Sequence, residues 1–526
     1  MAKSKDLTRR EFVAEAGKAT IGTFVAASAP LVVPSRVLGR DRHSAGKPIN
    51  VAIVGCGGMG SENAYALAQS EHFAAVCDVD LAYCEHQMRE VLGGNDGKAR
   101  EGAAKAAEQF AKAKRYTDFR ELLEKEKHVD GVVIATPDHL HGVIAKAAME
   151  RGRHVYVQKP LTASVHEARV LREMVLTHPK LVTQMGNQGH SSDDARLINE
   201  WIQAGIIGEV HEVHVWTNRP IVYWPQGLPR PTGVVPPPAS YGFDNPWTYR
   251  HVQDVLAGAM GSGGDPPPGF DWDLYRGPVA ENVPFHPVYH PFNWRGWLDF
   301  GAGALGDMGA HLIDHPFWAL QLPLPKSIEA TSTSWGTMPL PPLAPSAPAN
   351  TPAGRPQHRP VSFPVATSVH YEFAARGSHP PVKLFWSDGG IYPPRPDQLP
   401  DDVALKSEGG VIFIGETGIL LHDTYGKNPR LYPQELMAAA AAVPKSIPRI
   451  PWGHEQNWAK AIRGEAQASS PIDYASRLTE TMLLGIAALR AGQGKKLLYD
   501  GERGEFTNVP EANQYLTREY RAGWAI

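Results

Sequence analysis

Val51-Ala-Ile-Val-Gly-Cys-Gly-Gly-Met-Gly60 is the stretch that decides the fold of this chain. It begins as an apolar run rich in β-branched residues, which is typical of a parallel strand covered on both faces. Gly55, Gly57 and Gly60 then fall at G-x-G-x-x-G spacing, and residues 61–69 continue as a predicted helix. A strand, a glycine turn and a helix in this order predict a dinucleotide-binding unit, in which the turn lets the backbone approach a pyrophosphate.

A second strand, Phe73-Ala-Ala-Val-Cys-Asp78, ends in an acid eighteen residues after Gly60. In dinucleotide-binding folds a carboxylate at this position accepts hydrogen bonds from the adenosine ribose hydroxyls. Glycines also mark ordinary turns and an aspartate can simply cap a helix, but the combination favours the nucleotide. No Arg or Lys occurs in Val79-Asp-Leu81, so a 2′-phosphate would meet negative charge, and NAD is favoured over NADP.

The composition is that of a soluble globular protein with more than one domain. At 526 residues the chain is too long for one ordinary domain. With 42% hydrophobic residues, 20% charged residues and a formal net charge of −3, it gives no reason to expect nucleic acid or an anionic membrane as a partner. The three cysteines, Cys56, Cys77 and Cys84, lie in the nucleotide-binding unit, where packing explains them better than a disulfide or metal site.

Thr8-Arg9-Arg10-Glu11-Phe12 has a twin-arginine pattern and is followed by the mildly apolar residues 19–29. This stretch is too short and too weakly apolar to span a membrane, so no stable membrane anchor is expected. It resembles a bacterial twin-arginine export signal; the alternative is a disordered basic tail with an accidental Arg-Arg pair. We expect residues 1–47 to be signal and linker, the twin-arginine (Tat) export machinery to be a partner, and the protein to be periplasmic, or cytoplasmic if the signal is not functional. Export in the folded state would suit tightly bound NAD.

Residues 48–186 alternate between strand-like and helix-like segments. We expect strands at 131–135 and 154–157, helices at 98–114, 140–151 and 164–177, and a helix through residue 123 that Asp118 caps. Such alternation predicts a doubly wound parallel sheet, whose ligands bind at the carboxyl ends of the strands. Thr136-Pro137-Asp138-His139 and Gln158-Lys159-Pro160 lie at two such ends, which makes them candidate site residues.

Residues 187–526 have a different pattern and predict a second domain. Helices at 192–204 and 473–491, the latter amphipathic, and strands at 208–217, 365–372, 382–386 and 411–414 predict an α/β domain with an open, largely antiparallel sheet. Two long proline-rich segments interrupt it, 219–291 and 339–364, of which the second is expected to be a surface excursion. The residues after 497 are expected to return across the surface.

The first long segment is rich in aromatic residues. Trp224, Trp247 and Trp272, with Trp294 and Trp297 just beyond, could stack on sugar rings. Burial as core and interface anchors is the commoner role of such side chains and is the expectation for most of them.

Gly303-Ala-Leu-Gly-Asp307-Met-Gly-Ala-His311 carries the clearest acid–base pair outside the glycine turn. Asp307 and His311 are four residues apart, so a helix places them on one face. A carboxylate beside an imidazole fixes its tautomer and raises its basicity, as a general base working near neutral pH requires. A helix cap and a satisfied core histidine are the alternative, but the flanking glycines and Trp294-Arg295-Gly-Trp297 favour a pocket wall.

Four features occur in order along the chain: the glycine turn with Asp78, Thr136-Pro137, a Lys-Pro pair closing the next long strand, and Asp-x-x-x-His in a later helix. Over residues 50–522 the chain resembles the glucose–fructose oxidoreductase/inositol dehydrogenase family (Gfo/Idh/MocA). The resemblance implies an N-terminal Rossmann domain and a C-terminal α/β domain whose open sheet often forms the subunit interface, and hence a homo-oligomer, either dimer or tetramer. Residues 185–190 and 508–513 resemble the branch that carries twin-arginine signals.

The resemblance also implies roles for single residues. Lys159 polarises the reacting hydroxyl or carbonyl, and Asp307 and His311 match the catalytic Asp and His, with His311 as proton acceptor. Where the family has Glu-Lys-Pro, this chain has Gln158, whose neutral amide cannot supply a charge to tune Lys159. The expected cofactor-binding residues are Gly55, Gly57, Gly58, Met59, Gly60, Asp78, Thr136, Pro137, His139, His141, Gln158 and Lys159, and the expected substrate contacts are Asn187, Gln188, Trp294 and Arg295.

Three functions remain open. The first is an NAD(P)-dependent oxidoreductase that transfers a hydride to or from a CH–OH group of a sugar, cyclitol or glycoside. The second is redox-neutral glycoside cleavage, in which transient oxidation acidifies a neighbouring C–H, a group is eliminated or hydrolysed, and bound NAD is recycled. The third is a non-catalytic sugar- or nucleotide-binding protein, against which the set Lys159, Asp307 and His311 argues. No metal is expected, because His141, His190, His214, His290 and His315 lack zinc-like spacing.

Overall fold

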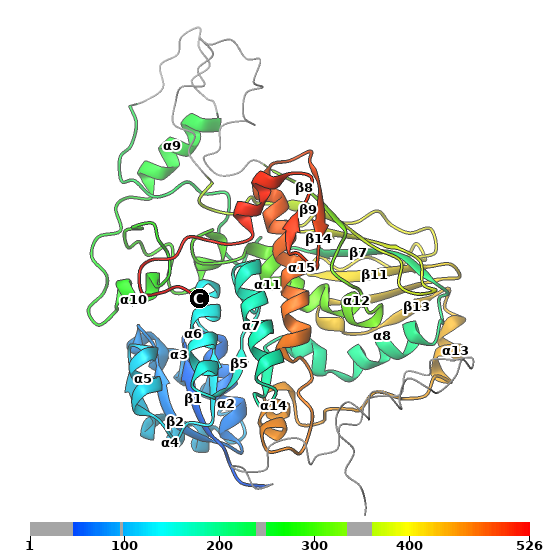
Figure 1. Ribbon diagram of the computed structural model, residues 1–526. Coiled ribbons are helices and arrows are strands. Elements are labelled where there is room, and N and C mark those ends of the chain that lie inside the picture. Colours follow the sequence, from blue (N-terminus) through cyan, green and yellow to red (C-terminus); the bar gives the residue numbers. More distant parts are fainter. Residues whose placement is uncertain (1–45, 95–97, 238–248, 334–359) are drawn as a thin grey trace, which may run out of the picture. The chain divides into compact units, whose positions relative to one another are not determined.

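The computed structural model describes residues 46–94, 98–237, 249–333 and 360–526 (Figure 1). The twin-arginine pattern, Trp247 and residues 339–359 of the second proline-rich segment lie outside the described residues. Within the described ranges, no helix combines the length and the apolarity that crossing a bilayer requires.

Six parallel strands form the first sheet of the described chain. They are β1 (Asn50–Val54), β2 (His72–Cys77), β3 (Lys114–Tyr116), β4 (Gly131–Ile134), β5 (His154–Val157) and β6 (Thr183–Met185), in the order β3-β2-β1-β4-β5-β6. β1 lies inside the sheet, paired with β2 and β4, and its apolar residues are buried. This is the doubly wound Rossmann arrangement that the sequence predicted, with the strand order reversing at β1.

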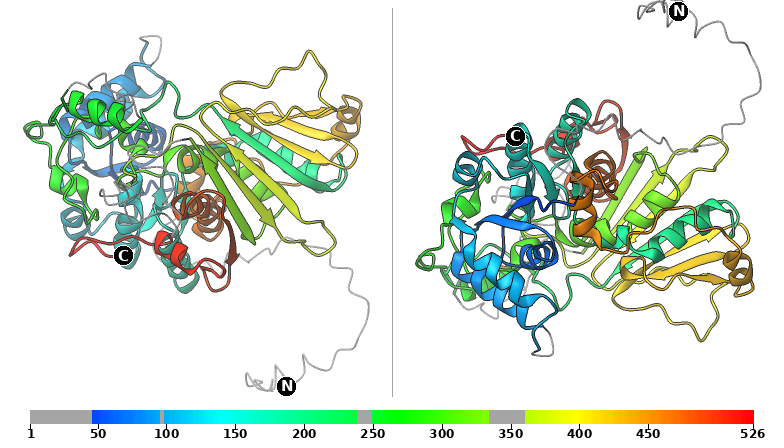
Figure 2. Two further views of the ribbon diagram at one scale, coloured as in Figure 1. Left: turned by 90° about the horizontal axis from the view of Figure 1, so that it is seen from above. Right: turned by 90° about the horizontal axis from the view of Figure 1, so that it is seen from below.

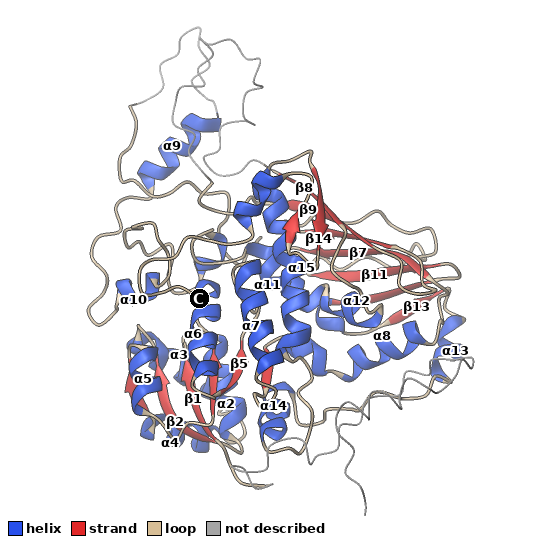
Figure 3. Ribbon diagram, viewed as in Figure 1, coloured by secondary structure: helices blue, strands red, loops and turns tan. Residues whose placement is uncertain are grey.

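Helices cover both faces of this sheet (Figure 3). α5 (Phe119–Lys125), α6 (Asp138–Glu150) and α7 (Val165–Thr177) share one core with the sheet, and α2 (Met59–Ala68), α3 (Leu81–Gly93) and α4 (Ala103–Lys112) share the other. Successive residues of β1 enter opposite cores, since Ala52 packs with the first set and Ile53 with the second. Asp118 caps α5 as predicted, but α4 begins later than residue 98 because Gly102 has a left-handed backbone with a φ of 76°.

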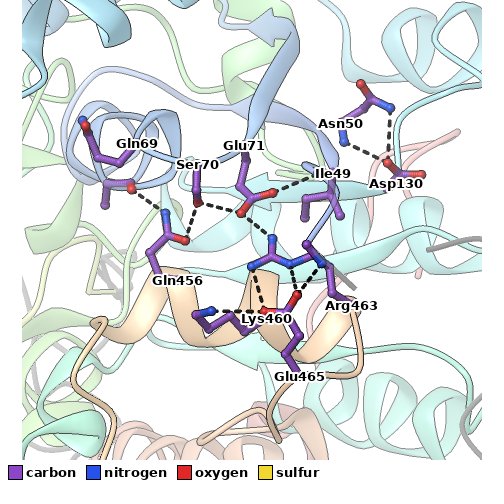
Figure 4. Close-up of polar contacts among 12 residues, drawn as sticks. Ile49, Asn50, Gln69, Ser70, Glu71, Asp130, Gln456, Lys460, Arg463 and Glu465 are labelled. Atoms are coloured by element: carbon purple, nitrogen blue, oxygen red, sulfur yellow. Dashed lines mark hydrogen bonds and ion pairs between the residues drawn. The ribbon is translucent and has the colours of Figure 1, made fainter. Parts of the chain in front are cut away.

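A helix far along the chain also packs on this domain. α14 (His454–Ile462) lies against α2, and its Trp458 is fully buried in the core on that face of the sheet. The buried Glu71 pairs with Arg463 at 2.5 Å, and Arg463 also pairs with Glu465 at 2.8 Å (Figure 4). Residues 454–465, which the sequence grouped with the second domain, therefore pack against the first sheet.

The second sheet has nine strands within the described residues (Figure 2). They are β7 (Val210–Thr217), β8 (Ser327–Ser332), β9 (Thr367–Phe373), β10 (Val382–Ser387), β11 (Gly409–Gly415), β12 (Ile419–Asp423), β13 (Arg430–Tyr432), β14 (Lys496–Asp500) and β15 (Glu505–Phe506), in the order β13-β12-β11-β7-β10-β9-β8-β14-β15. The β7–β10 pair is parallel and the other pairs are antiparallel. The prediction of a largely antiparallel second sheet is confirmed.

Helices α8 (Asp193–Gln203), α11 (Gly303–Leu312), α12 (Asp314–Ala319) and α15 (Ile472–Ala491) accompany the second sheet. α15 was expected to be amphipathic, and this is wrong, because Thr479, Glu480 and Thr481 are as deeply buried as the apolar Leu483 and Leu484. α15 packs on α7 of the first domain and on β8 of the second sheet, so two sides of the helix are covered.

The residues after 497 do not simply cross the surface, as the sequence suggested. β14 joins the second sheet through β8, and the later side chains Leu516 and Trp524 are buried. Trp524 reaches the first domain, where its ring lies 6.0 Å from that of Phe119.

The aromatic segment after β7 forms a core of its own. It contains α9 (Tyr249–Ala259) and α10 (Trp272–Arg276), and the 3-10 helix η2 (Asn293–Gly296) follows it. Trp294 and Trp297 are buried in this core, with Trp272 packed against them, and Trp224 is also buried. The remaining elements are α13 (Leu436–Ala441), η1 (Gln188–Ser191), η4 (Thr424–Gly426) and η5 (Pro510–Tyr515).

Candidate active site

A cavity of about 500 Å³ lies at the carboxyl ends of β1, β2, β4 and β5, the edge of a doubly wound sheet where ligands bind. The glycine turn forms one of its walls. Gly55 has a φ of +86°, and a Cβ on Gly60 would lie 1.8 Å from the Gly55 carbonyl oxygen, so neither position accepts a side chain. Gly57, Gly58 and Met59 line the cavity. A ligand can therefore approach the backbone closely at this wall.

Asp78 follows β2 and lines the same cavity. Its Oδ2 accepts the Cys56 amide at 2.6 Å and its Oδ1 accepts the Asp80 amide at 2.9 Å. Burial raises the pKa of Asp78, although both amides and the nearby His290 oppose the shift. The carboxylate thus braces the glycine turn at the position where a ribose would bind.

Residues after β4 and β5 form a second wall that fits a nucleotide. Thr136, Pro137, His141, Gln158 and Lys159 line it. Thr136 Oγ1 and Gln158 Oε1 are buried and have no hydrogen-bond partner among the described residues. Because buried polar atoms in folded proteins are normally paired, two unpaired atoms on one cavity wall fit a polar ligand. With the glycine turn and Asp78, the residues present fit a dinucleotide.

The two histidines that follow Thr136-Pro137 are both buried, and of the two His141 lines the cavity. His139 is 0% exposed, and its ring nitrogens lie 2.8 Å from the Tyr275 carbonyl and 3.1 Å from the Phe300 carbonyl. His141 lies 2.8 Å from the Pro160 carbonyl. Burial lowers the pKa of His139 to about 3 and that of His141 to about 4. Both rings are neutral at neutral pH, and the structure does not place His139 on the cavity.

Lys159 and Asp307 meet where the two domains join. Lys159 Nζ lies 2.5 Å from Asp307 Oδ1, and Arg295 Nε lies 3.4 Å from the same oxygen. Burial alone would raise the pKa of Asp307, but the charges of Lys159 and Arg295 outweigh it and hold the pKa well below its usual range. The carboxylate is therefore ionised and holds two cations at the end of the nucleotide cavity.

His311 lies one helical turn after Asp307 on α11 and is 4% exposed. Its Nδ1 has no hydrogen-bond partner among the described residues, and its ring meets Tyr425 edge-on at 4.8 Å. Burial and the charge of Lys159 lower its pKa to about 3, so the imidazole is neutral. Asp307, Met308 and Tyr425 line the cavity, whereas His311 lies behind them. The Tyr425 backbone has a φ of 65°, which is uncommon for a non-glycine residue and clusters at functional sites.

Gln158, the departure from Glu-Lys-Pro, belongs to a buried polar chain. Its Nε2 donates to Asn63 Oδ1 at 2.9 Å, and Asn63 Nδ2 donates to Glu455 Oε1 at 2.9 Å. Burial raises the pKa of Glu455. A carboxyl group is thus present two hydrogen bonds away from Gln158, on a helix that the sequence did not connect with the site.

The residues expected to bind substrate fall into two groups. Trp294 and Arg295 line the cavity, with the Arg295 guanidinium 4.1 Å from the Trp294 ring centre. Asn187 is 0% exposed, and neither of its side-chain polar atoms has a partner among the described residues. Gln188 hydrogen-bonds to Glu455. The structure therefore places Asn187 and Gln188 behind the cavity wall.

Asp138 was a candidate from its position at a strand end, without an assigned role, and sequence reasoning missed several other lining residues. Asp138 accepts the Ala302 amide at 2.9 Å, and burial raises its pKa to about 7 against the charges of Arg295 and Lys159. Arg219, Tyr425 and Trp524 come from distant segments and also line the cavity. Only Asp138 had a signal in the sequence, namely its position at a strand end.

The histidines considered for a metal have other contacts. His190 Nδ1 lies 3.0 Å from Asp314, His214 Nε2 lies 2.6 Å from Glu212, and His290 Nε2 lies 2.9 Å from Asp80. In the ranges that the structure describes, no group of three His, Cys, Asp or Glu residues could hold a metal ion.

The fold and the cavity define a dinucleotide-binding Rossmann scaffold. Residues 49–185 match the family described as "Oxidoreductase family, NAD-binding Rossmann fold" (GFO_IDH_MocA). The nucleotide-binding domain thus matches the Gfo/Idh/MocA family that the sequence resembles, and the NAD-binding description agrees with the expected cofactor.

Similar proteins are matched over part of their length. The glycosyl hydrolase family 109 protein 1 of Shewanella sp. (strain MR-4) is 25% identical over 216 residues, which is 39% of this chain and 44% of that protein. The levoglucosan dehydrogenase of Pseudarthrobacter phenanthrenivorans is 28% identical over 162 residues, 31% of this chain and 39% of that protein. The chain thus spans less than half the length of these relatives.

A solved structure supports the fold over a longer span. The WlbA dehydrogenase from Bordetella pertussis, in complex with NADH and UDP-GlcNAcA, has a TM-score of 0.51 at 14% identity, covering 86% of this chain and 99% of that one. At this identity the likeness shows the fold alone.

Proposed function

We propose that the protein is an NAD-dependent oxidoreductase that transfers a hydride to or from a secondary hydroxyl of a sugar, cyclitol or glycoside. The observation that carries the proposal is the 2.5 Å contact of Lys159 with Asp307 at the end of a cavity built for a dinucleotide. A cation held beside a neutral buried imidazole is an acid–base set that alcohol oxidation requires and a binding module does not.

The chain's own residues supply the acid–base chemistry. NAD supplies the hydride acceptor or donor when bound. Lys159 donates a hydrogen bond to the reacting oxygen, and Asp307, braced by Arg295, holds the ammonium in place. Neutral His311 accepts the hydroxyl proton as the carbon–oxygen double bond forms. Asp307 and Asp314 favour its protonated form, which offsets part of the cost of charging a buried ring. Tyr425 lines the cavity and its ring meets that of His311 edge-on at 4.8 Å, so the proton passes beside the Tyr425 ring to reach His311.

Redox-neutral glycoside cleavage is the second candidate function. The similarity to a glycosyl hydrolase family 109 protein over 216 residues favours it. The same Lys159 and His311 would serve a transient oxidation, after which the new carbonyl acidifies the neighbouring C–H. A base then takes that proton as the leaving group departs, water adds to the resulting double bond, and the hydride returns to the carbonyl carbon.

Export and assembly complete the proposal. The twin-arginine pattern supports passage through the twin-arginine machinery to the periplasm, with NAD already bound and recycled on the protein. Homo-oligomerisation through the open face of the second sheet follows from the family resemblance.

Purified protein mixed with a panel of sugars, cyclitols and glycosides tests these functions. The absorbance of bound NADH and the masses of the products are followed together, with Asp307→Asn protein in parallel. NADH formation with a product two mass units lighter supports the first function. Cleavage with constant total NAD supports the second. Absence of turnover across the panel in a protein that binds sugars would favour a non-catalytic protein and overturn both.

A further inference from the structure

Two segments outside the nucleotide-binding fold line one end of the cavity. Leu274 of α10 and Trp524 both contribute to its wall. Thr117 and Phe119 after β3, and Leu140 and Ile144 of α6, line it as well. This end is therefore apolar and partly aromatic, unlike the end that holds Lys159.

The position of Asp78 identifies this as the adenosine end. The Asp78 amide donates to the Tyr116 carbonyl at 3.0 Å, which places Thr117 directly beside the ribose-binding carboxylate. In doubly wound folds the pyrophosphate lies at the glycine turn and the adenosine ribose at this acid, so the adenine lies beyond it. Phe119 is next along the chain, and its ring lies 6.0 Å from that of Trp524.

Trp524 is held firmly in this position. It is 5% exposed, and the Arg120 guanidinium lies 4.7 Å from its ring centre. A Cβ on Gly277 would lie 2.5 Å from Leu140 Cδ2 and 3.3 Å from the indole, so a side chain at this position would crowd both residues. The tryptophan thus packs between α5 and the α10 segment.

The last residues and the α10 segment are also joined to each other. The Arg521 amide donates to the Pro278 carbonyl at 3.1 Å, and the Arg521 guanidinium pairs with Asp273. Val279 and Tyr520 form an antiparallel β-bridge. In Figure 1 the last residues, drawn in red, run past α10 toward α6.

The joined segments are anchored to the Rossmann domain at two places. His290 Nε2 lies 2.9 Å from Asp80 Oδ2, and the Asp271 amide donates to the Val79 carbonyl at 3.1 Å, both just after the ribose-binding Asp78. Arg518 pairs with Glu167 of α7 at 2.6 Å. These contacts hold the two segments beside Asp78, at the end of the cavity where the adenosine is expected.

We propose that residues 271–290 and 518–524 form an adenosine clasp that closes the nucleotide cavity and slows the release of NAD. The proposal rests on the proposed function, because it takes NAD as the occupant. It explains how a cofactor could be retained after export, since each ion pair and the Trp524 contact must open before the adenosine leaves. Trp524 acts as a binding residue and Arg521 as a positioning residue.

Exchange of bound NAD against labelled NAD measures the clasp directly. Trp524→Ala is expected to release NAD about 10-fold faster or more, the scale of losing an aromatic contact to a base. Trp452→Ala is the matched control, because that tryptophan is exposed and packs beside Lys460 away from the cavity. Arg521→Gln, which does not line the cavity, is expected to speed release by a smaller factor.

Binding of two fragments of NAD distinguishes a clasp at the adenosine end from a general loss of structure in the variants. Binding of ADP-ribose should weaken in Trp524→Ala, whereas binding of nicotinamide mononucleotide, which lacks adenosine, should not change. Equal release rates in wild type, Trp524→Ala and Arg521→Gln would overturn the clasp while leaving the proposed function intact. If wild-type protein binds neither NAD nor NADP, the proposed function fails and the clasp fails with it. Should Trp524→Ala not fold, Trp524→Phe and Arg521→Gln decide by the same readout.

Discussion

Lys159 Nζ and Asp307 Oδ1, 148 residues apart in the chain, lie 2.5 Å apart in the structure. One follows strand β5 of the Rossmann sheet and the other lies on α11 of the second domain. Both residues line the cavity, and Arg295 approaches the same carboxylate oxygen at 3.4 Å. The charged centre of the site is therefore made by packing of the two domains.

Replacing Asp307 with Asn should disable catalysis without emptying the nucleotide cavity. The amide keeps the shape of the side chain but cannot hold the Lys159 ammonium by a charge-assisted bond. We expect turnover to fall by about 10²-fold or more, the range over which positioned acid–base groups act. NAD content by heat release should stay at the wild-type value. The exposed Asp402→Asn is the control, and a turnover in Asp307→Asn equal to that of this control would contradict the role.

His311→Ala should keep NAD bound and lower turnover by roughly 10² or more if His311 takes the hydroxyl proton. The loss should appear in kcat more than in KM, because the imidazole lies behind the cavity lining. Steady-state kinetics at several pH values check this. The exposed His370→Ala serves as the control. Near-normal turnover in His311→Ala would remove this residue from the base role.

Gly60→Ala should abolish nucleotide binding or the folding of the turn. The new Cβ would lie 1.8 Å from the Gly55 carbonyl oxygen, which is a steric clash. The backbone of the turn would have to move to relieve this clash. Gly93→Ala is the matched control, because no atom lies within 4 Å of its new Cβ. NAD content and the temperature of unfolding are measured for both proteins. A Gly60→Ala protein that retains wild-type NAD would show that the turn does not need this glycine.

Gln158→Glu should destabilise the protein at neutral pH. The new carboxylate would be buried at one end of the hydrogen-bond network that connects residue 158 through Asn63 to Glu455. Burial also raises the pKa of Glu455. We expect a loss of about 2 kcal/mol or more in the free energy of unfolding, as for other uncompensated buried charges. Chemical denaturation measures this. The double variant Gln158→Glu with Glu455→Gln should recover much of the loss, and a failure to recover would show that the two positions do not interact.

His454 should make stability fall in acid. Burial lowers the pKa of this ring to about 4 in the folded protein, whereas an unfolded histidine titrates near ~6.5. A depressed histidine pKa means that the neutral form is favoured by folding. The contribution of His454 to the free energy of unfolding is complete above pH ~6.5 and is lost as the pH falls toward 4.

The expected loss through His454 is about 2–3 kcal/mol at pH ~4.5. Comparing unfolding of wild type and His454→Gln at pH ~7.5 and ~4.5 isolates this term, because the other buried groups titrate alike in both proteins. The difference between the free energies of unfolding at the two pH values should be smaller in the variant. An equal gap in both proteins would mean that His454 does not contribute.

Local patterns predicted most of the Rossmann half. The run at Val51, the glycine spacing and the cap at Asp118 each depend on neighbours a few residues away, so their physics is visible in the sequence. α4 was predicted to begin five residues too early, because the composition around Lys98 favours a helix, while Gly102 adopts a left-handed backbone. For α15 the helix was correct but its exposed face was not, since two domains cover it.

The candidate site was predicted less completely, because only part of it depends on residues that are close together in the sequence. Motif residues such as Asp78, Lys159 and Asp307 could be found because chemistry ties residue types to short patterns or to a family resemblance. Tyr425, Arg219 and Trp524 line the same cavity from segments with no such pattern. Asn187 and His139 were expected at the ligand, and the structure places both behind the wall, because backbone carbonyls and packing determine which side of a strand end a side chain occupies.

By itself the sequence determined a nucleotide-binding Rossmann domain that favours NAD, and a second domain with an antiparallel sheet. Both predictions follow from the periodicity of apolar residues and from glycines that are required by close contacts within their own turn. Only the tertiary structure decided that Glu455 lies two hydrogen bonds from Gln158, that the His311 ring meets Tyr425, and that Trp524 lines the cavity beside Phe119. Each of these contacts joins residues more than a hundred positions apart. Interactions between neighbouring residues do not determine which distant surfaces pack together, so these contacts could not be predicted from local patterns.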